Sequence, residues 1–207
     1  MNENLQQHDD EPTDNHIWNE EVATTYVEKY GEHPINRQTA ERAGLTPDDY
    51  LLDIGCGSGS ALRAAATIVT HGQLIGVDPT PAMVRFSQTE SADHPGFGRM
   101  RFLLGGAEAL PLPDNRVTVC WAINSLHHWQ DIAQGLAEAR RVIVPNGRFI
   151  VVEEIFPEGH GFEADEVKMH LSSAGFEVEG ASIQETDDAQ FNVLVARNVV
   201  EHNVKED

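Results

Sequence analysis

Residues 51–60 read Leu51-Leu52-Asp53-Ile54-Gly55-Cys56-Gly57-Ser58-Gly59-Ser60, and this stretch decides the fold. Its apolar start predicts a buried strand that enters a glycine-rich turn, and the alanine-rich residues that follow predict a helix. Glycine accepts positive φ angles and lets a ligand approach the backbone, while the start of a helix offers unpaired N–H groups. This arrangement is typical of nucleotide sites at the carboxyl ends of parallel strands. The alternative is a glycine-rich turn that holds no ligand.

The spacing of the glycines separates two classes of nucleotide ligand. The dinucleotide fingerprint Gly-x-Gly-x-x-Gly would require a glycine at position 60. That position is Ser60, and the third glycine comes one residue early, at Gly59. The pattern Asp-x-Gly-x-Gly-x-Gly therefore argues against NAD and favours another adenosine ligand.

A second acidic residue, Asp78, ends the next apolar run, nineteen residues after Gly59. A carboxylate at this place can accept both ribose hydroxyls of an adenosine. A plain helix N-cap is the alternative, because Asp78 and Thr80 precede a predicted helix. Next to the glycine loop, the ribose role is favoured.

Outward from this stretch, apolar runs alternate with helical stretches. The expected strands are residues 50–54, 73–77, 100–104, 117–123, 147–154, 176–183 and 190–197. The expected helices are residues 60–70, 81–89, 131–142 and 163–174. The alternation predicts an α/β fold with a parallel sheet covered on both faces. The last two strands have no helix between them and should pair antiparallel.

The two ends of the chain depart from this alternation. Residues 1–15 are polar and acidic and predict a disordered tail, and residues 199–207 predict a C-terminal tail. With 207 residues and 40% hydrophobic content, the chain supports one core, so residues 16–198 are expected to form a single domain. The first part of that domain, residues 16–45, predicts amphipathic helices interrupted near Pro34.

The amino-acid composition limits the kinds of partner that the protein is expected to bind. The formal net charge is -20, from 14 basic against 34 acidic residues, which disfavours nucleic acid and anionic membrane surfaces. No apolar run approaches the roughly 20 residues that span a bilayer, and no signal peptide is recognisable. Cys56 and Cys120 form no CxxC pair, and no metal-binding cluster is visible. We predict a cytoplasmic protein without a metal, and the sequence does not indicate its oligomeric state.

Taken together, these residues resemble the class I S-adenosylmethionine (SAM)-dependent methyltransferases, in particular the group whose domain is labelled type 11. The resemblance covers about half the chain, residues 50–154. Its motifs come in family order: LLDIGCGSG, GVDPTPAMV, GGAEALPLPDNRV, NSLHHW and RRVIVPNGRFIVVEE. It implies a Rossmann-like, doubly wound fold, with a seven-stranded, mostly parallel sheet whose last strand is inserted antiparallel.

The resemblance also implies roles for single residues. The glycine loop would lie under the methionine part of SAM, and Asp53 would anchor the loop and, through it, the amino group. Asp78 would hold the ribose, with Pro79 and Met83 near the adenine. The implied cofactor-binding residues are Asp53, Gly55, Cys56, Gly57, Gly59, Asp78, Pro79, Met83, Gly106, Ala107, Glu108 and Asn124. Methyl transfer to a small-molecule acceptor would leave S-adenosylhomocysteine (SAH).

Three positions depart from the family pattern. The family has an acid that reaches the adenine amino group where this chain has Gly106, so the backbone of Ala107 or the side chain of Glu108 would have to substitute. The family's Phe-Asp at the start of the fourth strand is Val117-Thr118 here. Its Pro-Gly-Gly turn contains Asn146, which also tolerates left-handed geometry.

His127 and His128 are the candidate catalytic residues, because they follow the fourth strand where methyl group and acceptor should meet. An imidazole titrates near neutral pH and can act as a general base. The alternative, which the family favours, is that one histidine packs inward and the other caps the next helix. Glu153 and Glu154 end the fifth strand on the same side, and they either contact the acceptor or face solvent.

Trp18, Tyr26 and Tyr30 are the aromatic residues of the N-terminal helices. In related enzymes this region closes over the cofactor as a lid, and aromatic faces attract a sulfonium cation. The alternative is an ordinary buried helix face. We therefore predict a SAM-dependent methyltransferase acting on a small molecule. A catalytically silent SAM- or SAH-binding module and a NAD(P)-dependent oxidoreductase are the alternatives.

Overall fold

The structure is a computed structural model, and it describes residues 17–156 and 162–199. The predicted tail at 1–15 lies outside the described residues, and so does all of the predicted C-terminal tail except Val199.

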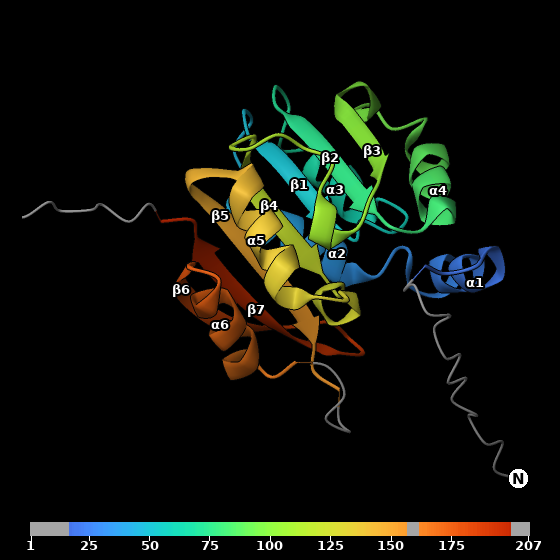
Figure 1. The fold of residues 1–207 in the computed structure, drawn as a ribbon. Coiled ribbons are helices and arrows are strands. Elements are labelled where there is room, and N and C mark those ends of the chain that lie inside the picture. The colour runs from blue at the N-terminus through green and yellow to red at the C-terminus, as the bar shows by residue number, and fades with distance from the viewer. Residues whose placement is uncertain (1–16, 157–161, 200–207) are drawn as a thin grey trace, which may run out of the picture.

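A single seven-stranded sheet organises the described chain (Figure 1). Its strands are β1 (Tyr50–Ile54), β2 (Gln73–Asp78), β3 (Met100–Leu104), β4 (Val117–Ile123), β5 (Ile143–Glu154), β6 (Glu177–Glu185) and β7 (Gln190–Arg197). The strand order is β3-β2-β1-β4-β5-β7-β6, and β7 runs antiparallel to both of its neighbours. The predicted Rossmann-like sheet, with its last strand inserted antiparallel, is confirmed.

Helices cover both faces of the sheet. They are α1 (Glu20–Tyr30), α2 (Pro34–Arg42), α3 (Ser60–Ala65), α4 (Pro81–Ser91), α5 (Ile132–Val142) and α6 (Ala164–Ser173), with short 3-10 turns η1 (Phe97–Arg99), η2 (Ala107–Ala109) and η3 (Leu126–His128). Helices α5 and α6 lie on the face toward the viewer in Figure 1, and α2 and α3 lie behind the sheet.

The two faces of β1 show how the sequence makes these layers. Successive side chains of a strand point to opposite faces. Leu52 and Ile54 therefore join the core under α5 and α6, while Leu51 joins the core under α2 and α3. All three side chains are buried, which explains why apolar residues occupy positions on both faces of the strand.

Two expected boundaries differ in the structure. The helix expected at 60–70 ends at Ala65, and the N–H groups of Thr67 and Ile68 then donate three residues back, to the carbonyls of Ala64 and Ala65, as in a tightened last turn. Strand β5 begins earlier than expected, at Ile143, and its register with β4 shifts before Arg148. Asn146 adopts a positive φ of 63° within that irregular stretch, so the strand passes through the predicted turn.

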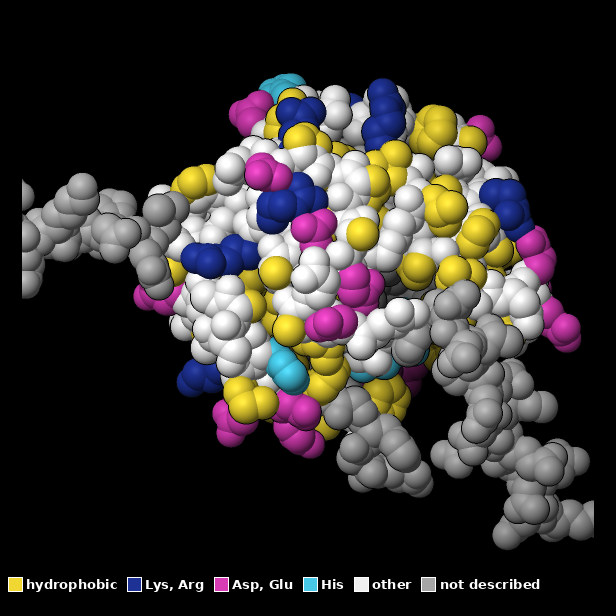
Figure 2. Space-filling view, viewed as in Figure 1, with side chains coloured by type: hydrophobic (Ala, Val, Ile, Leu, Met, Phe, Trp, Pro, Cys, Tyr) yellow, Lys and Arg dark blue, Asp and Glu magenta, His cyan; other side chains and the backbone are white. Residues whose placement is uncertain are grey.

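The outer surface is acidic overall but mixed in detail. On the face drawn in Figure 2, acidic side chains are scattered among neutral and apolar ones, and the basic side chains of the described residues form no continuous patch. Within residues 17–156 and 162–199, no helix is both long and apolar enough to cross a membrane.

Candidate functional site

A cavity of about 510 Å³ opens at the carboxyl ends of the central parallel strands, where β1 and β2 end at Ile54 and Asp78. The helices α1 and α2 and the turns η2 and η3 contribute its other walls. The predicted site residues among its lining are Asp53, Gly55, Cys56, Gly57, Asp78, Pro79, Met83, Gly106, Ala107, Glu108, Asn124 and His128. The fold thus brings residues from four of the five sequence motifs to one cavity.

The three glycines of the loop have distinct environments, although all have positive φ angles of 50° to 80°. A Cβ at Gly57 would meet no atom within 4 Å, so its backbone faces open space. A Cβ at Gly55 would lie 2.5 Å from the Cβ of Ser125. Gly59, which the sequence assigned to the cofactor, caps α3 and packs against the Phe102 ring, outside the cavity lining.

The Asp78 carboxylate ties the glycine loop to the start of α4. Its Oδ2 accepts from the Gly57 N–H at 3.0 Å, and its Oδ1 accepts from the Thr80 N–H at 2.9 Å. Burial raises the pKa of Asp78 to about 6, against these two hydrogen bonds, which lower it. A carboxylate offers about four acceptor positions, so the oxygens retain capacity for ligand hydroxyls.

A second buried carboxyl group, Asp53, lies beneath the loop. Burial raises the pKa of Asp53 to about 7. The cavity is also lined by Glu108, while the described part of its lining contains neither Lys nor Arg. A cavity with three acids and no such base favours a cationic ligand over an anionic one.

The N-terminal helical segment, residues 17–45, closes one side of the cavity with aromatic rings. The centroids of Trp18 and Tyr26 lie 4.7 Å apart, and those of Tyr26 and Tyr30 lie 5.2 Å apart. The Trp18 ring also meets the His128 ring edge-on at 5.7 Å, and the backbone N–H of Trp18 donates to the Thr80 hydroxyl at 3.2 Å. All three aromatic residues line the cavity, so they do more than bury a helix face.

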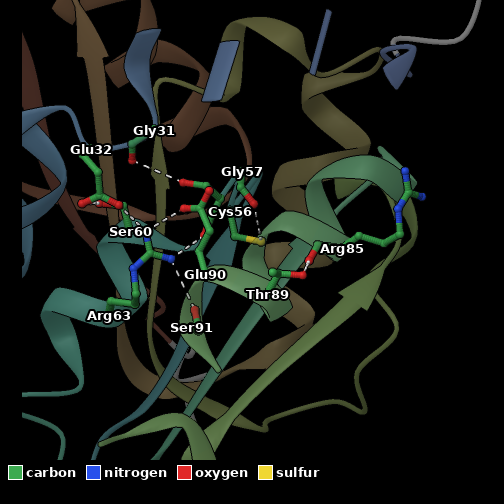
Figure 3. A network of polar contacts seen from close by, with 11 residues as sticks. Gly31, Glu32, Cys56, Gly57, Ser60, Arg63, Arg85, Thr89, Glu90 and Ser91 are labelled. Atoms are coloured by element: carbon green, nitrogen blue, oxygen red, sulfur yellow. Dashed lines mark hydrogen bonds and ion pairs between the residues drawn. The ribbon is translucent and has the colours of Figure 1, made fainter. Parts of the chain in front are cut away.

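Arginine side chains hold this segment to the rest of the domain. Figure 3 shows Arg63 directed toward Glu32 and Glu90, and it pairs with both. Arg63 also donates to the Ser58 carbonyl in the glycine loop at 2.6 Å. At the other end of α1, Glu20 pairs with Arg85 of α4. The polar network thus connects the segment directly to the loop beneath it.

Beside His128, a second histidine pairs with a buried carboxylate. His127 Nδ1 lies 2.5 Å from Oε2 of Glu153, which has no exposed surface. The other oxygen of Glu153 accepts from the Leu126 N–H at 2.8 Å. The rings of His127 and His128 are 4.0 Å apart, but only His128 is part of the cavity lining. The sequence left two alternatives for Glu153, contact with the acceptor or exposure to solvent. Its side chain is buried and does not line the cavity, so neither alternative holds.

One family departure, Thr118, and one predicted cofactor residue, Asn124, have clear structural roles. The Thr118 hydroxyl donates to the Asp49 carboxylate at 2.6 Å and accepts from the Tyr50 N–H at 3.1 Å, so it fastens the start of β1, away from the cavity. Asn124 has a φ of 48°, and its side-chain oxygen accepts from the Glu154 N–H at 3.0 Å, which links the ends of β4 and β5. No group of three or more potential metal-ligating side chains occurs among the residues that the structure describes.

The fold and the site define a class: an α/β protein with a crevice, rich in acids and aromatic rings, at the carboxyl edge of its sheet. Comparison with known proteins agrees. A model described as "Methyltransferase domain" matches residues 52–151. The 27-O-demethylrifamycin SV methyltransferase of Amycolatopsis mediterranei is 31% identical over 186 residues, which are 79% of this chain and 66% of that protein. The chain belongs to the class I SAM-dependent methyltransferase family.

A second curated relative is similar to a shorter part of the chain. The demethylmenaquinone methyltransferase of Symbiobacterium thermophilum is 34% identical over 126 residues, which are 59% of this chain and 49% of the relative. The chain thus spans about half to two thirds of the length of these two curated relatives. Among solved structures, a SAM-dependent methyltransferase from Aquifex aeolicus superposes with a TM-score of 0.73 at 20% identity, over 88% of this chain and 100% of that one.

The same fold also occurs in a protein named for a different reaction. The [4+2]-cyclase SpnF matches with a TM-score of 0.70 at 23% identity, over 80% of this chain and 81% of that one. At these identities the structural matches establish the fold alone.

Proposed function

We propose that this chain binds SAM in the cavity and catalyses methyl transfer to a small-molecule acceptor, with SAH as the second product. The observation that carries the proposal is the pair of buried acids, Asp53 and Asp78, beside an open glycine backbone at Gly57. SAM carries positive charge on its sulfur and amino group, which suits a cavity lined by acids and aromatic faces. The two phosphates of NAD(P) would be repelled by the same acids, which opposes the oxidoreductase alternative.

The residues present fit this cofactor in three places. The loop at Gly55, Cys56 and Gly57 would carry the methionine part, with Asp53 beneath it favouring the amino group. Asp78 would accept the ribose hydroxyls with the capacity left after its two backbone hydrogen bonds. Pro79 and Met83, on the same side as Asp78, would contact the adenosine, and Asn124 would lie near the methyl group. When bound, SAM supplies a methyl group on a positively charged sulfur with a good leaving group.

Residues 16–45 serve as a lid in this proposal, within one domain that extends over residues 16–198. The aromatic rings of Trp18, Tyr26 and Tyr30 already line the cavity, and the segment reaches the glycine loop through Arg63. Covering the site excludes water and strengthens electrostatic contacts inside it. The protein's main contribution to the rate would then be alignment of acceptor and methyl group, worth about 7–11 kcal/mol in favourable cases.

For acceptors that must lose a proton, His127 would be the general base, and the acceptor hydroxyl would reach it past the ring of His128, which lines the cavity 4.0 Å from the His127 ring. Because the Glu153 carboxylate can accept the Nδ1–H, the Nε2 lone pair of His127 would remain available. The proton of an acceptor hydroxyl would pass to Nε2 as the oxygen forms its bond to the methyl carbon. His128, which lines the cavity beside Trp18, would then position the acceptor. The relatives' names give two small molecules, a demethylmenaquinone and a 27-O-demethylrifamycin SV, which supports a small acceptor.

Calorimetric titration with SAM and SAH is the first test, with NADH as the control ligand. We expect micromolar SAH binding, at least tenfold weaker in Asp78→Asn, with no binding of NADH. Thermal unfolding of the variant checks that the loop anchored by Asp78 is still folded. Failure of the folded wild-type protein to bind either adenosyl ligand would refute the proposal, and binding of NADH alone would restore the oxidoreductase alternative.

Turnover separates an enzyme from a silent binding module. The protein is incubated with SAM and a panel of phenols, hydroquinones and amines, and SAH formation is measured. With an accepted hydroxyl substrate, His127→Asn should lower kcat about 100-fold or more while SAH affinity stays within twofold. Glu153→Gln should alter the pH profile of kcat, because it changes the partner of the imidazole. A panel that yields no SAH, with a protein that binds SAM, would favour the silent module.

A further inference from the structure

A second, smaller cavity lies under the end of α2, on the face of the sheet opposite α5 and α6 (Figure 1). Its volume is about 150 Å³, and residues of α2 and of strands β5, β6 and β7 line it. The side chains of Ile150 and Val193 give it an apolar floor. It shares no described lining residue with the proposed SAM site, and it has room for one small molecule.

The charged residues in the described lining of this cavity are two arginines, Arg42 and Arg148. Arg148 donates to the carbonyls of Ala43 at 2.5 Å and Gly44 at 3.1 Å, which uses two of the five N–H groups of its guanidinium. Arg42 is exposed, and within residues 17–156 and 162–199 neither arginine forms an ion pair. Since the chain has 34 acidic against 14 basic residues, two guanidinium groups left without an acid at one cavity favour an anion from outside the chain.

Two buried polar side chains at the same cavity also lack partners. Thr39 is 2% exposed and Gln184 is 7% exposed, and both line the cavity. The hydroxyl oxygen of Thr39 and Oε1 of Gln184 have no hydrogen-bond partner among the described residues. Buried polar atoms are nearly always paired, and an amide oxygen can only accept. A ligand that completes this site must therefore bring a hydrogen-bond donor as well as a negative charge.

We propose that this cavity binds a short hydroxycarboxylate of about three or four carbon atoms. Its carboxylate accepts from the guanidinium of Arg42 and the hydroxyl of Thr39. Its hydroxyl donates to Oε1 of Gln184, and its carbon atoms contact Ile150 and Val193. Inorganic phosphate would leave that apolar floor without a contact. This inference does not depend on the proposed SAM site, whose lining is acidic.

The test measures binding of small acids to the full chain at constant ionic strength, by thermal unfolding and by NMR titration of isotope-labelled protein. Lactate and 3-hydroxybutyrate are compared with propionate and butyrate, which lack only the hydroxyl, and with lactamide, which lacks the charge. We expect at least one hydroxy acid to raise the thermal midpoint by about 3–5 °C at ten times its Kd. The matching acid without the hydroxyl should bind about tenfold more weakly, because Oε1 of Gln184 stays unpaired, and lactamide should not bind. No binding of either hydroxy acid at tens of millimolar would overturn the inference.

Two arginine variants on the same helix separate this cavity from the general surface. Arg42→Gln removes a charge from the cavity and should weaken binding of the hydroxy acid at least tenfold. Arg37→Gln is the matched control, because Arg37 is 73% exposed, pairs with Glu41 and is not part of the lining. Its affinity for the acid should stay within twofold of the wild-type value. Equal losses in both variants would show attraction to surface charge alone and would overturn the inference.

Gln184→Leu tests recognition of the ligand hydroxyl. The substitution removes the acceptor at similar volume, so the hydroxy acid and the matching plain acid should bind within twofold of each other. A tenfold preference that survives in this variant would overturn the assignment of the hydroxyl to Gln184. The unfolding midpoint without ligand checks that the variant is folded.

A competition experiment keeps the two cavities apart. The hydroxy acid should not displace SAH, because the main cavity is lined by acids that repel a carboxylate. Displacement would place the acid in the main cavity and would overturn this inference. Failure of the protein to bind SAH would refute the proposed function, while binding of the acid with its dependence on Arg42 would still support the second site.

Discussion

Two walls of the cavity are built from different kinds of contact. The floor, formed by the ends of β1 and β2 and the glycine loop, is fixed by buried hydrogen bonds such as Ser125 Oγ to the Ile54 carbonyl at 2.6 Å. The proposed lid is held at its far end by the pair of Glu20 and Arg85, whose side chains are 67% and 55% exposed. Exposed ion pairs contribute about 0–1 kcal/mol, whereas breaking a buried hydrogen bond costs about 1–3 kcal/mol. The difference indicates a rigid floor that sets ligand geometry and a lid whose far end can be displaced at little cost.

The largest effect on stability should come from Gly55→Ala, which changes a residue of the floor itself. The new Cβ would lie 2.5 Å from that of Ser125, at a φ of 77° that alanine rarely adopts. Overpacking and backbone strain together should lower the free energy of unfolding by about 3 kcal/mol. Urea denaturation measures this loss. A loss below about 1 kcal/mol would show that the floor yields more easily than its contacts indicate.

Acidification should weaken SAM binding through the floor's two acids. Burial raises the pKa of Asp53 to about 7 and that of Asp78 to about 6, so both groups become neutral as the pH falls through these values. A cationic ligand favours the ionised forms, and if it requires both, its affinity should be about a hundredfold lower at pH 5.5 than at pH 7.5. Calorimetry across this range measures the slope, and Asp53→Asn should flatten it while weakening binding at pH 7.5. An affinity that does not change with pH in the wild-type protein would show that these acids do not contact the ligand.

Gly57→Ala is the matched counterpart of Gly55→Ala, in the same loop and with a positive φ of 50°. Its Cβ would enter open cavity space, so we expect a stability loss of only about 1 kcal/mol but a SAH affinity at least tenfold lower. The two glycines would then separate the structural and the ligand-facing parts of one turn. Equal effects of both substitutions on stability, with no effect of Gly57→Ala on binding, would contradict that division.

The smallest effect should come from the lid. Arg85→Gln removes the exposed pair with Glu20 and should change SAH affinity less than threefold. Arg63→Gln should weaken binding more, because Arg63 is mostly buried and also bonds the Ser58 carbonyl of the floor. Titrations in low and high NaCl extend the comparison, since screening affects the exposed pair first. If Arg85→Gln weakened binding as much as Gly57→Ala, the lid would have to be regarded as part of the rigid wall.

The features that could be predicted best from the sequence are those that depend on residues close together in the chain. The strand, the glycine turn and Asp78 were readable because each is signalled within a few residues, and parallel strands bring their ends together. The burial of Glu153 could not be predicted, because its partner His127 lies 26 residues earlier in the chain, in the turn after β4. The orientation of Glu108 depends likewise on the N–H groups of Gln130 and Asp131. Such contacts arise only when the sheet is assembled.

The dual attachment of Asp78 has a consequence for tracing ancestry. One carboxylate fixes the glycine loop through Gly57 and the entry to α4 through Thr80, so its loss would loosen the domain even in a descendant that no longer methylates anything. Selection for a foldable chain alone would thus preserve the aspartate, and with it the signature by which such proteins are recognised. A change of chemistry on this scaffold should instead leave its record at His127, where no backbone junction depends on the imidazole.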